Sequence, residues 1–111
     1  MRETEILKEI QTAFPYYGGR LLRNNVGRLR DVRGNYVQYG LGVGSSDLIG
    51  WLPVDISGEK RAIFVALEVK TEKTFPTLGQ RQFIQAVKDA GGIAGIVRST
   101  QDVRELIDSY L

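Results

Sequence analysis

The stretch Arg61-Ala-Ile-Phe-Val-Ala-Leu-Glu-Val-Lys70 decides the fold. It is almost continuously apolar until it reaches Glu68 and Lys70, which is typical of a central strand covered on both faces. A second apolar segment, residues 47–53, precedes it, and the turn-rich sequence Asp55-Ile-Ser-Gly-Glu-Lys60 separates the two. This pattern predicts a β-hairpin at the centre of a sheet.

The register of this hairpin depends on where the chain turns. If it folds about Ser57-Gly58, antiparallel pairing places Asp47 opposite Glu68 and Trp51 opposite Phe64. The Cβ atoms of such a pair lie about 4.5–5.5 Å apart. A different loop length would move Asp47 by one or two positions. The sequence therefore predicts two carboxylates side by side.

Opposed carboxylates repel each other unless a cation lies between them. A divalent ion would use Asp47, Glu68 and the backbone carbonyl of Val69 as oxygen ligands. Lys70 falls on the same strand face as Glu68, where its ammonium could orient or help deprotonate a water. Together these groups meet the needs of metal-assisted phosphodiester hydrolysis. The alternative is a surface salt bridge between Lys70 and one of the acids.

The composition narrows the chemistry further. The 111 residues fit one domain over residues 1–111, and the chain has neither cysteine nor histidine. Disulfides, thiolate nucleophiles, Cys/His zinc sites and Ser-His-Asp triads are therefore excluded, and oxygen ligands favour Mg²⁺, Mn²⁺ or Ca²⁺. Because no apolar run approaches the roughly 20 residues of a membrane span, we expect a cytoplasmic protein without membrane contact.

Positive charge is concentrated in residues 20–33, which carry five arginines against one aspartate in a chain of net charge +2. Guanidinium groups are bidentate donors to phosphate, so this segment predicts contact with nucleic acid. The predicted DNA-binding residues are Arg20, Arg23, Asn24, Asn25, Arg28, Arg30 and Arg33. The alternative is a basic loop that is only solvated.

The periodicity of apolar residues outlines the remaining elements. It predicts helices over residues 2–14, over 78–90 and after a cap at Ser99 or Thr100, a buried strand over 93–97, and moderate strands over 20–26 and 35–43. The expected order is helix, three strands, helix, strand, helix, which is a single α/β domain.

Several motifs, in order, resemble a known nuclease family. Asp47 with Glu68-Val-Lys70 is similar to the Asp…(Asp/Glu)-x-Lys signature of the restriction-endonuclease-like superfamily. The segments Gly44-Ser-Ser-Asp-Leu-Ile-Gly50, Glu68-Val-Lys-Thr71, Gln80-Arg-Gln-Phe83 and Ala90-Gly-Gly-Ile-Ala-Gly95 resemble its VRR-NUC branch, in the stand-alone form of phages and bacteria. Ser46 replaces the proline that is usual in the superfamily, as in the Gly-Ser-Ser-Asp variant.

The resemblance implies a restriction-endonuclease-like core, in which helices flank a central mixed β-sheet. It also implies Mg²⁺ as the cofactor, with Mn²⁺ able to substitute. The metal ligands would be Asp47 and Glu68, and Lys70 would be catalytic.

The resemblance also implies two further catalytic residues on helices. The first is a glutamate near the N-terminus. Glu3 lies in the middle of the apolar stripe of its helix, whereas Glu5 and Glu9 are alternatives on the opposite face and at the edge. The second is a glutamine that matches Gln80, although Thr77-Leu-Gly-Gln80 is also a capping box.

The function predicted from these features is a Mg²⁺-dependent DNA endonuclease. Stand-alone members resemble homodimeric Holliday junction resolvases, so the expected partners are branched DNA and a second copy of this chain. Apolar dimer contacts could come from Tyr110-Leu111 or from residues 14–17. A flap, nick or restriction-type nuclease with the same site is one alternative. A non-catalytic nucleic-acid-binding module is another, but such a module has no use for paired acids near phosphate.

Overall fold

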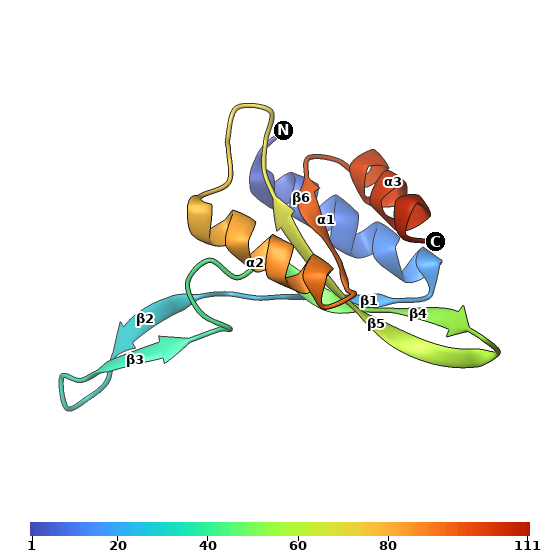
Figure 1. Ribbon diagram of the computed structural model, residues 1–111. Coiled ribbons are helices and arrows are strands. Elements are labelled where there is room, and N and C mark those ends of the chain that lie inside the picture. The colour runs from blue at the N-terminus through green and yellow to red at the C-terminus, as the bar shows by residue number, and fades with distance from the viewer.

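The computed structural model describes all residues from 1 to 111. Its elements in chain order are α1 (Glu3–Ala13), the 3-10 helix η1 (Phe14–Tyr17), β1 (Arg20–Arg23), β2 (Gly27–Arg30), β3 (Tyr36–Tyr39), β4 (Leu48–Ile56), β5 (Glu59–Val69), α2 (Leu78–Asp89), β6 (Ile93–Val97) and α3 (Thr100–Tyr110). A four-stranded sheet in the order β1-β4-β5-β6 forms the centre of the molecule. Helices α1 and α3 lie on one face of it and α2 on the other (Figure 1).

Strand β5 is central, as the sequence predicts. It pairs antiparallel with β4 and parallel with β6, so the sheet is mixed. The strand residues Val65, Leu67 and Val69 pack into the main core with α1 and α3. Ala66 instead packs with Ile84 of α2 on the other face. Because side chains alternate along a strand, Glu68 shares the α2 face with Ala66.

The structure confirms the predicted register of the β4–β5 hairpin. Its turn is Ser57-Gly58, with positive φ angles of 51° and 83°. Trp51 pairs with Phe64, and the ladder runs back as far as Leu48. Asp47 immediately precedes that ladder, which brings it level with Glu68. Both strands reach further toward the turn than predicted, because two residues suffice to reverse the chain.

The core order α1-β1-β4-β5-α2-β6-α3 matches the predicted helix, three strands, helix, strand, helix. The strands predicted over 20–26 and over 35–43 are both present but shorter, since β1 covers only Arg20–Arg23 and β3 only Tyr36–Tyr39. The structure also adds β2, within the segment that was predicted to be a basic loop. The chain leaves the sheet after Arg23. The next residue, Asn24, still donates a hydrogen bond from its N–H to the carbonyl of Asp47. Strands β2 and β3 then pair only with each other.

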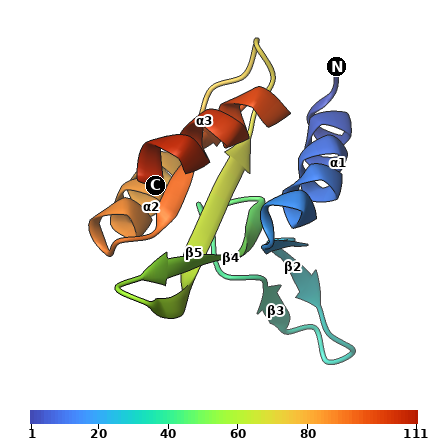
Figure 2. The ribbon, with the colours of Figure 1, turned by 90° about the vertical axis from the view of Figure 1, so that its right-hand side faces the viewer.

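We call residues Gly27–Tyr39, which comprise β2, β3 and their turn, the arm. It stands clear of the three helices in both views (Figures 1 and 2). The molecule measures 52 × 33 × 25 Å, and its radius of gyration is 15.1 Å. A compact domain of this length has a radius of gyration of about 13 Å, so the arm elongates the molecule. None of α1, α2 and α3 is both long and apolar enough to cross a membrane.

Helix α1 ends at Ala13, one residue earlier than predicted, because Pro15 favours the 3-10 turn of η1. Phe14 is only 1% exposed and belongs to the core, whereas Tyr16 is 91% exposed. Residues 14–17 therefore do not form the continuous apolar surface that was predicted as one possible dimer contact.

Candidate active site

Glu68 is a carboxylate enclosed in the protein. It is 2% exposed, and its Oε2 lies 3.5 Å from Nζ of Lys70. Its Oε1 is buried without any hydrogen-bond partner. Burial and the adjacent carboxyl of Asp47 raise the pKa of Glu68 from 4.5 to about 8, although Lys70 acts in the opposite direction. A buried carboxyl in this position must either keep its proton or be matched by positive charge.

Asp47 is fixed beside Glu68 by the backbone of two strands. Its Oδ2 accepts a hydrogen bond of 3.0 Å from the N–H of Val69 on β5. Its carbonyl accepts a bond of 2.8 Å from the N–H of Asn24, at the end of β1. The structure therefore brings Asp47, Glu68 and Lys70 together at one end of the sheet, as the hairpin register predicts.

The segment that precedes Asp47 is held by Asn24. The Nδ2 group of this side chain donates to Oγ of Ser45, at 2.8 Å, and to the carbonyl of Ser46, at 2.9 Å. Its Oδ1 accepts a bond of 3.1 Å from the N–H of Leu41. Asn24 was predicted to bind DNA, but these bonds occupy its amide within the chain. Its observed role is to hold the loop that carries Asp47.

Helix α2 begins beside the same loop. Gly44 has a φ of +89°, and a Cβ there would lie 3.1 Å from the backbone of Gly79, so the two segments approach closely. Gln80 forms the capping box predicted from the sequence. Its Oε1 accepts from the N–H of Thr77 at 2.9 Å, and its own N–H donates to Oγ1 of Thr77 at 3.1 Å. These two bonds do not use its Nε2 group, which is therefore free to donate to another acceptor.

A cleft of about 480 Å³ joins this site to the root of the arm. Asp47 and Gln80 line one part of it, and Arg23, Asn25 and Arg28 line another. Four of the predicted DNA-binding residues, Arg23, Asn24, Asn25 and Arg28, thus line the same cleft as Asp47. This arrangement can hold a phosphate chain next to Asp47.

The other predicted DNA-binding arginines lie outside the cleft. Arg30 and Arg33 are further out, on β2 and on the turn of the arm. Arg20 begins β1 and pairs with Trp51, at the opposite end of that strand from Asn24. The structure thus spreads the basic segment along the molecule instead of gathering it at one point.

Glu3 does not join the two carboxylates. Its Oε2 accepts a bond of 2.9 Å from Oγ1 of Thr74, in the loop between β5 and α2. Glu5 is exposed, and Glu9 lines a separate pocket with Thr71 and other residues. No group of three or more acidic side chains in the structure is close enough to hold a metal ion together. The site therefore contains two carboxylates and not three.

The two carboxylates nevertheless fit a divalent cation. The buried Oε1 of Glu68 lacks a partner, and burial together with the adjacent Asp47 carboxyl raises the pKa of Glu68. Oxygen atoms of Asp47 and Glu68 are the ligand type that Mg²⁺ and Mn²⁺ prefer. A cation bound between them would satisfy the free oxygen and remove the repulsion.

The family model of the VRR-NUC domain matches residues 2–101. This chain belongs to the VRR-NUC family. A solved structure described as a VRR_NUC domain is 24% identical to it, covers 98% of this chain and 97% of its own, and has a TM-score of 0.62. No curated protein matches the chain.

The family identifies this chain as a nuclease domain, which implies DNA as its substrate. The structural match confirms the predicted fold class, since both chains share the mixed sheet with helices on each face. The arginine-lined cleft agrees with such a substrate, because it leads from the arm to Asp47.

Proposed function

We propose that this VRR-NUC domain is a metal-dependent endodeoxyribonuclease that hydrolyses phosphodiesters in structured DNA. One observation carries the proposal, namely the buried carboxylate of Glu68, with an unpaired oxygen, between Asp47 and Lys70. A structural ion pair would not need an orphaned oxygen, because desolvating it is costly. Metal-assisted hydrolysis does need such an oxygen, as a ligand.

Each residue of the site then has a distinct part. Asp47, Glu68 and the carbonyl of Val69 would hold Mg²⁺, or Mn²⁺ in its place. When bound, the ion supplies a Lewis acid that polarises the phosphate and lowers the pKa of a water. Lys70 holds a positive charge next to Glu68, and its ammonium N–H groups can orient that water or donate to a phosphate oxygen. The Nε2 group of Gln80 can donate to a phosphate oxygen in the cleft.

Cleavage assays test the site directly. Asp47→Ala or Glu68→Ala should abolish cleavage, while DNA binding in EDTA stays equal or becomes tighter because negative charge near phosphate is removed. Lys70→Ala should lose turnover and keep Mg²⁺ binding by calorimetry. Undiminished cleavage by either carboxylate variant would refute the assignment, and lost Mg²⁺ affinity in the lysine variant would make Lys70 structural.

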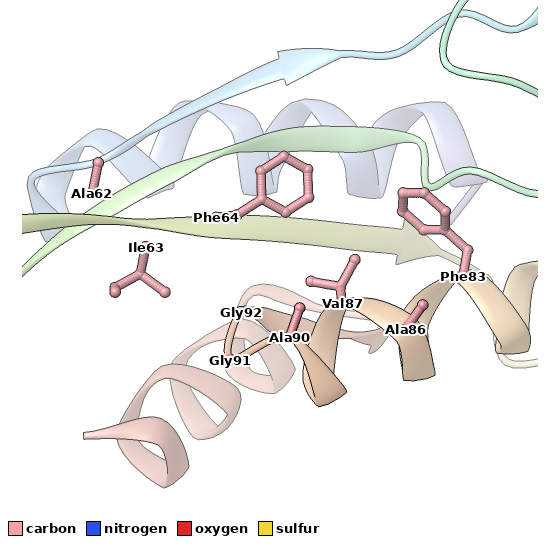
Figure 3. A pocket seen from close by; sticks show the side chains of 9 residues that line it. All are labelled: Ala62, Ile63, Phe64, Phe83, Ala86, Val87, Ala90, Gly91 and Gly92. Carbon is pink, nitrogen blue, oxygen red and sulfur yellow. The ribbon is translucent and has the colours of Figure 1, made fainter.

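We further propose that the substrate is a four-way junction, cut by a homodimer. One site cannot cut two strands in a coordinated way, whereas a two-fold dimer presents two identical sites. An apolar groove of about 450 Å³ between β5 and α2 supports a contact between copies. Phe83 and Val87 of α2, and Ala90 directly after it, line this groove with Phe64 of β5, which is 43% exposed (Figure 3).

The decisive comparison uses four-way junction, flap, nicked and linear duplex DNA, each with Mg²⁺, Mn²⁺ or EDTA. Preferred cleavage of the junction, abolished by EDTA, is the expected result. Preference for a flap or nick would assign the same chemistry to another DNA shape. Binding without cleavage under every condition would leave only a nucleic-acid-binding module.

A further inference from the structure

The arm has two chemically different faces. Residues that pair across an antiparallel ladder share a face, and successive pairs alternate. Arg28 pairs with Gln38 and Arg30 with Tyr36, which makes one face basic and polar. Leu29 pairs with Val37 on the opposite face, and Gly27 pairs with Tyr39 there. Within these four pairs, no charged residue belongs to the second, apolar face.

The basic face continues the wall of the candidate active site. Arg28 and Gln38 line the cleft that contains Asp47. Further along the arm, the Tyr36 ring lies 5.7 Å from the guanidinium of Arg28 and 5.0 Å from that of Arg30. Nη2 of Arg30 also donates to the Tyr36 hydroxyl at 3.1 Å. The ring thus holds both guanidinium groups in a row that leads away from the site, as phosphate binding requires.

The apolar face is left open. Leu29 is 64% exposed, Val37 48% and Tyr39 42%, and none of them belongs to either core cluster. Tyr39 lies over Gly27, where any Cβ would come within 2.3 Å of its hydroxyl, so its ring is kept against the strand. A two-stranded hairpin with one uncovered apolar face is marginally stable by itself. The face therefore needs something to cover it.

DNA offers a broad apolar surface, beyond the single thymine methyls of its major groove, only where its base stack is interrupted. The outside of a continuous duplex presents phosphates and polar groove edges, whereas base faces open to protein at kinks, branches and single strands. An element with arginines on one face and leucine, valine and tyrosine on the other matches such an interruption. We propose that the arm inserts at the branch point of the DNA, with its basic face on the phosphates and its apolar face against the bases.

This inference rests on the proposed nuclease function. If it holds, the length of the arm determines how far from the branch point the DNA is cut. The five residue-to-residue steps from Gly27, which lines the cleft, to Val32 at the turn span about 16 Å at 3.3 Å per step. At about 3.4 Å per base pair, the arm reaches roughly five base pairs. Cleavage should therefore fall within about five nucleotides of the branch.

A second copy of the chain is a weaker occupant of the same face. Two arms joined through Leu29, Val37 and Tyr39 would bury far less than the roughly 800 Å² per partner of a stable interface. The positive charge of the basic face and its continuity with the cleft both favour DNA as the occupant.

Binding in EDTA tests the inference apart from catalysis. The double variant Leu29→Ser/Val37→Ser should lose about tenfold in affinity for a four-way junction, since stacking on one base contributes on this order. Its affinity for linear duplex, and the salt dependence of that affinity, should stay within about twofold because the arginines remain. The matched control is Ile56→Ser/Phe75→Ser, which removes two exposed apolar side chains that lie outside the arm.

A probe on the wild-type protein avoids any effect of the variants on folding. A junction with 2-aminopurine at the branch should change its emission on binding, and a junction with the probe ten base pairs away should not. Equal emission at both places, or an unchanged junction preference in the double variant, would overturn the inference. A double variant that turns a dimer into a monomer would assign the face to a second copy instead.

The outcomes also separate this inference from the proposed function. Junction preference that depends on the arm, with no cleavage of any DNA, would refute the nuclease and keep the arm assignment. Mg²⁺-dependent cleavage that ignores the branch would do the opposite.

Discussion

At the residue scale, Glu68 links the stability of the protein to pH. Its pKa in the folded chain, about 8, is above the ordinary 4.5 because of burial and of Asp47. The folded state therefore holds its proton more tightly than the unfolded state. The stability that this provides is fully present below about pH 4.5 and is lost as the pH rises toward 8. A bound cation would reverse the loss.

We expect Glu68→Gln to stabilise the metal-free protein at high pH. The amide keeps the shape of the side chain and needs no proton, so the gain at pH 8.5 in EDTA should be on the order of 1–3 kcal/mol. The gain should vanish near pH 4.5. Thermal unfolding at both pH values measures it, with the exposed Glu72→Gln as the control. An equal gain at both pH values would contradict the raised pKa.

Asn24 leads to a second prediction at this scale. Asn24→Ala removes three hydrogen bonds that hold the loop before Asp47, so kcat should fall at least tenfold. Binding to DNA in EDTA should change little. The matched control is Asn25→Ala, which also lines the cleft and should weaken binding while kcat is kept. If Asn24→Ala instead loses binding with normal turnover, this residue contacts DNA as the sequence suggested.

These residues show how far a sequence can predict a site. The pairing of Asp47 with Glu68 was predictable because a two-residue turn fixes the register of everything behind it. The role of Asn24 was not, because its partners lie 17 to 22 residues away and no local pattern marks them. The helix phase gave the face of Glu3 correctly as inward. The helix phase could not show that the Glu3 carboxylate would accept a hydrogen bond from Thr74.

At the element scale, Gln80 combines a helix cap with a place in the cleft. Gln80→Glu tests the two roles separately, since glutamate at this position also completes a capping box. We expect unchanged thermal stability and a loss of cleavage of tenfold or more, because the Nε2 donor is gone. Thr77→Ala should instead cost about 1 kcal/mol of stability through the lost cap. Full cleavage activity in Gln80→Glu would limit this residue to capping.

The arm was the element that the sequence described least well. Residues 20–33 were predicted to be a strand followed by a basic loop, because strand signals depend on one buried face. Every residue of β3 and most of β2 are exposed, so this signal is weak in the arm, and of its two strands only β3 lies within a predicted strand. The core strands, by contrast, carried continuous apolar runs, and their order was predicted correctly.

At the scale of the whole molecule, one helix covers only part of one sheet face. Helix α2 packs on β5 and β6 and leaves apolar side chains of β1 and β4 open. Leu22 is 55% exposed and Trp51 41%, and both share the face of Phe64. In the sequence these residues look like core positions, because a strand pattern does not reveal how much of a face its helix covers. This open surface adjoins the groove of Figure 3.

A charge placed in that groove should separate a dimer without disturbing either active site. Ala86 of α2 is exposed and lines the groove, and glutamate is a good helix former, so Ala86→Glu should fold normally. In sedimentation the wild type should be a dimer that makes paired cuts in a junction, and Ala86→Glu a monomer that makes single nicks. Leu111→Glu, on the other exposed apolar candidate, is the control. If Leu111→Glu alone disrupts the dimer, the interface lies at the end of α3. If the wild type stays monomeric on junction DNA, coordinated resolution is excluded, although the nuclease chemistry is not.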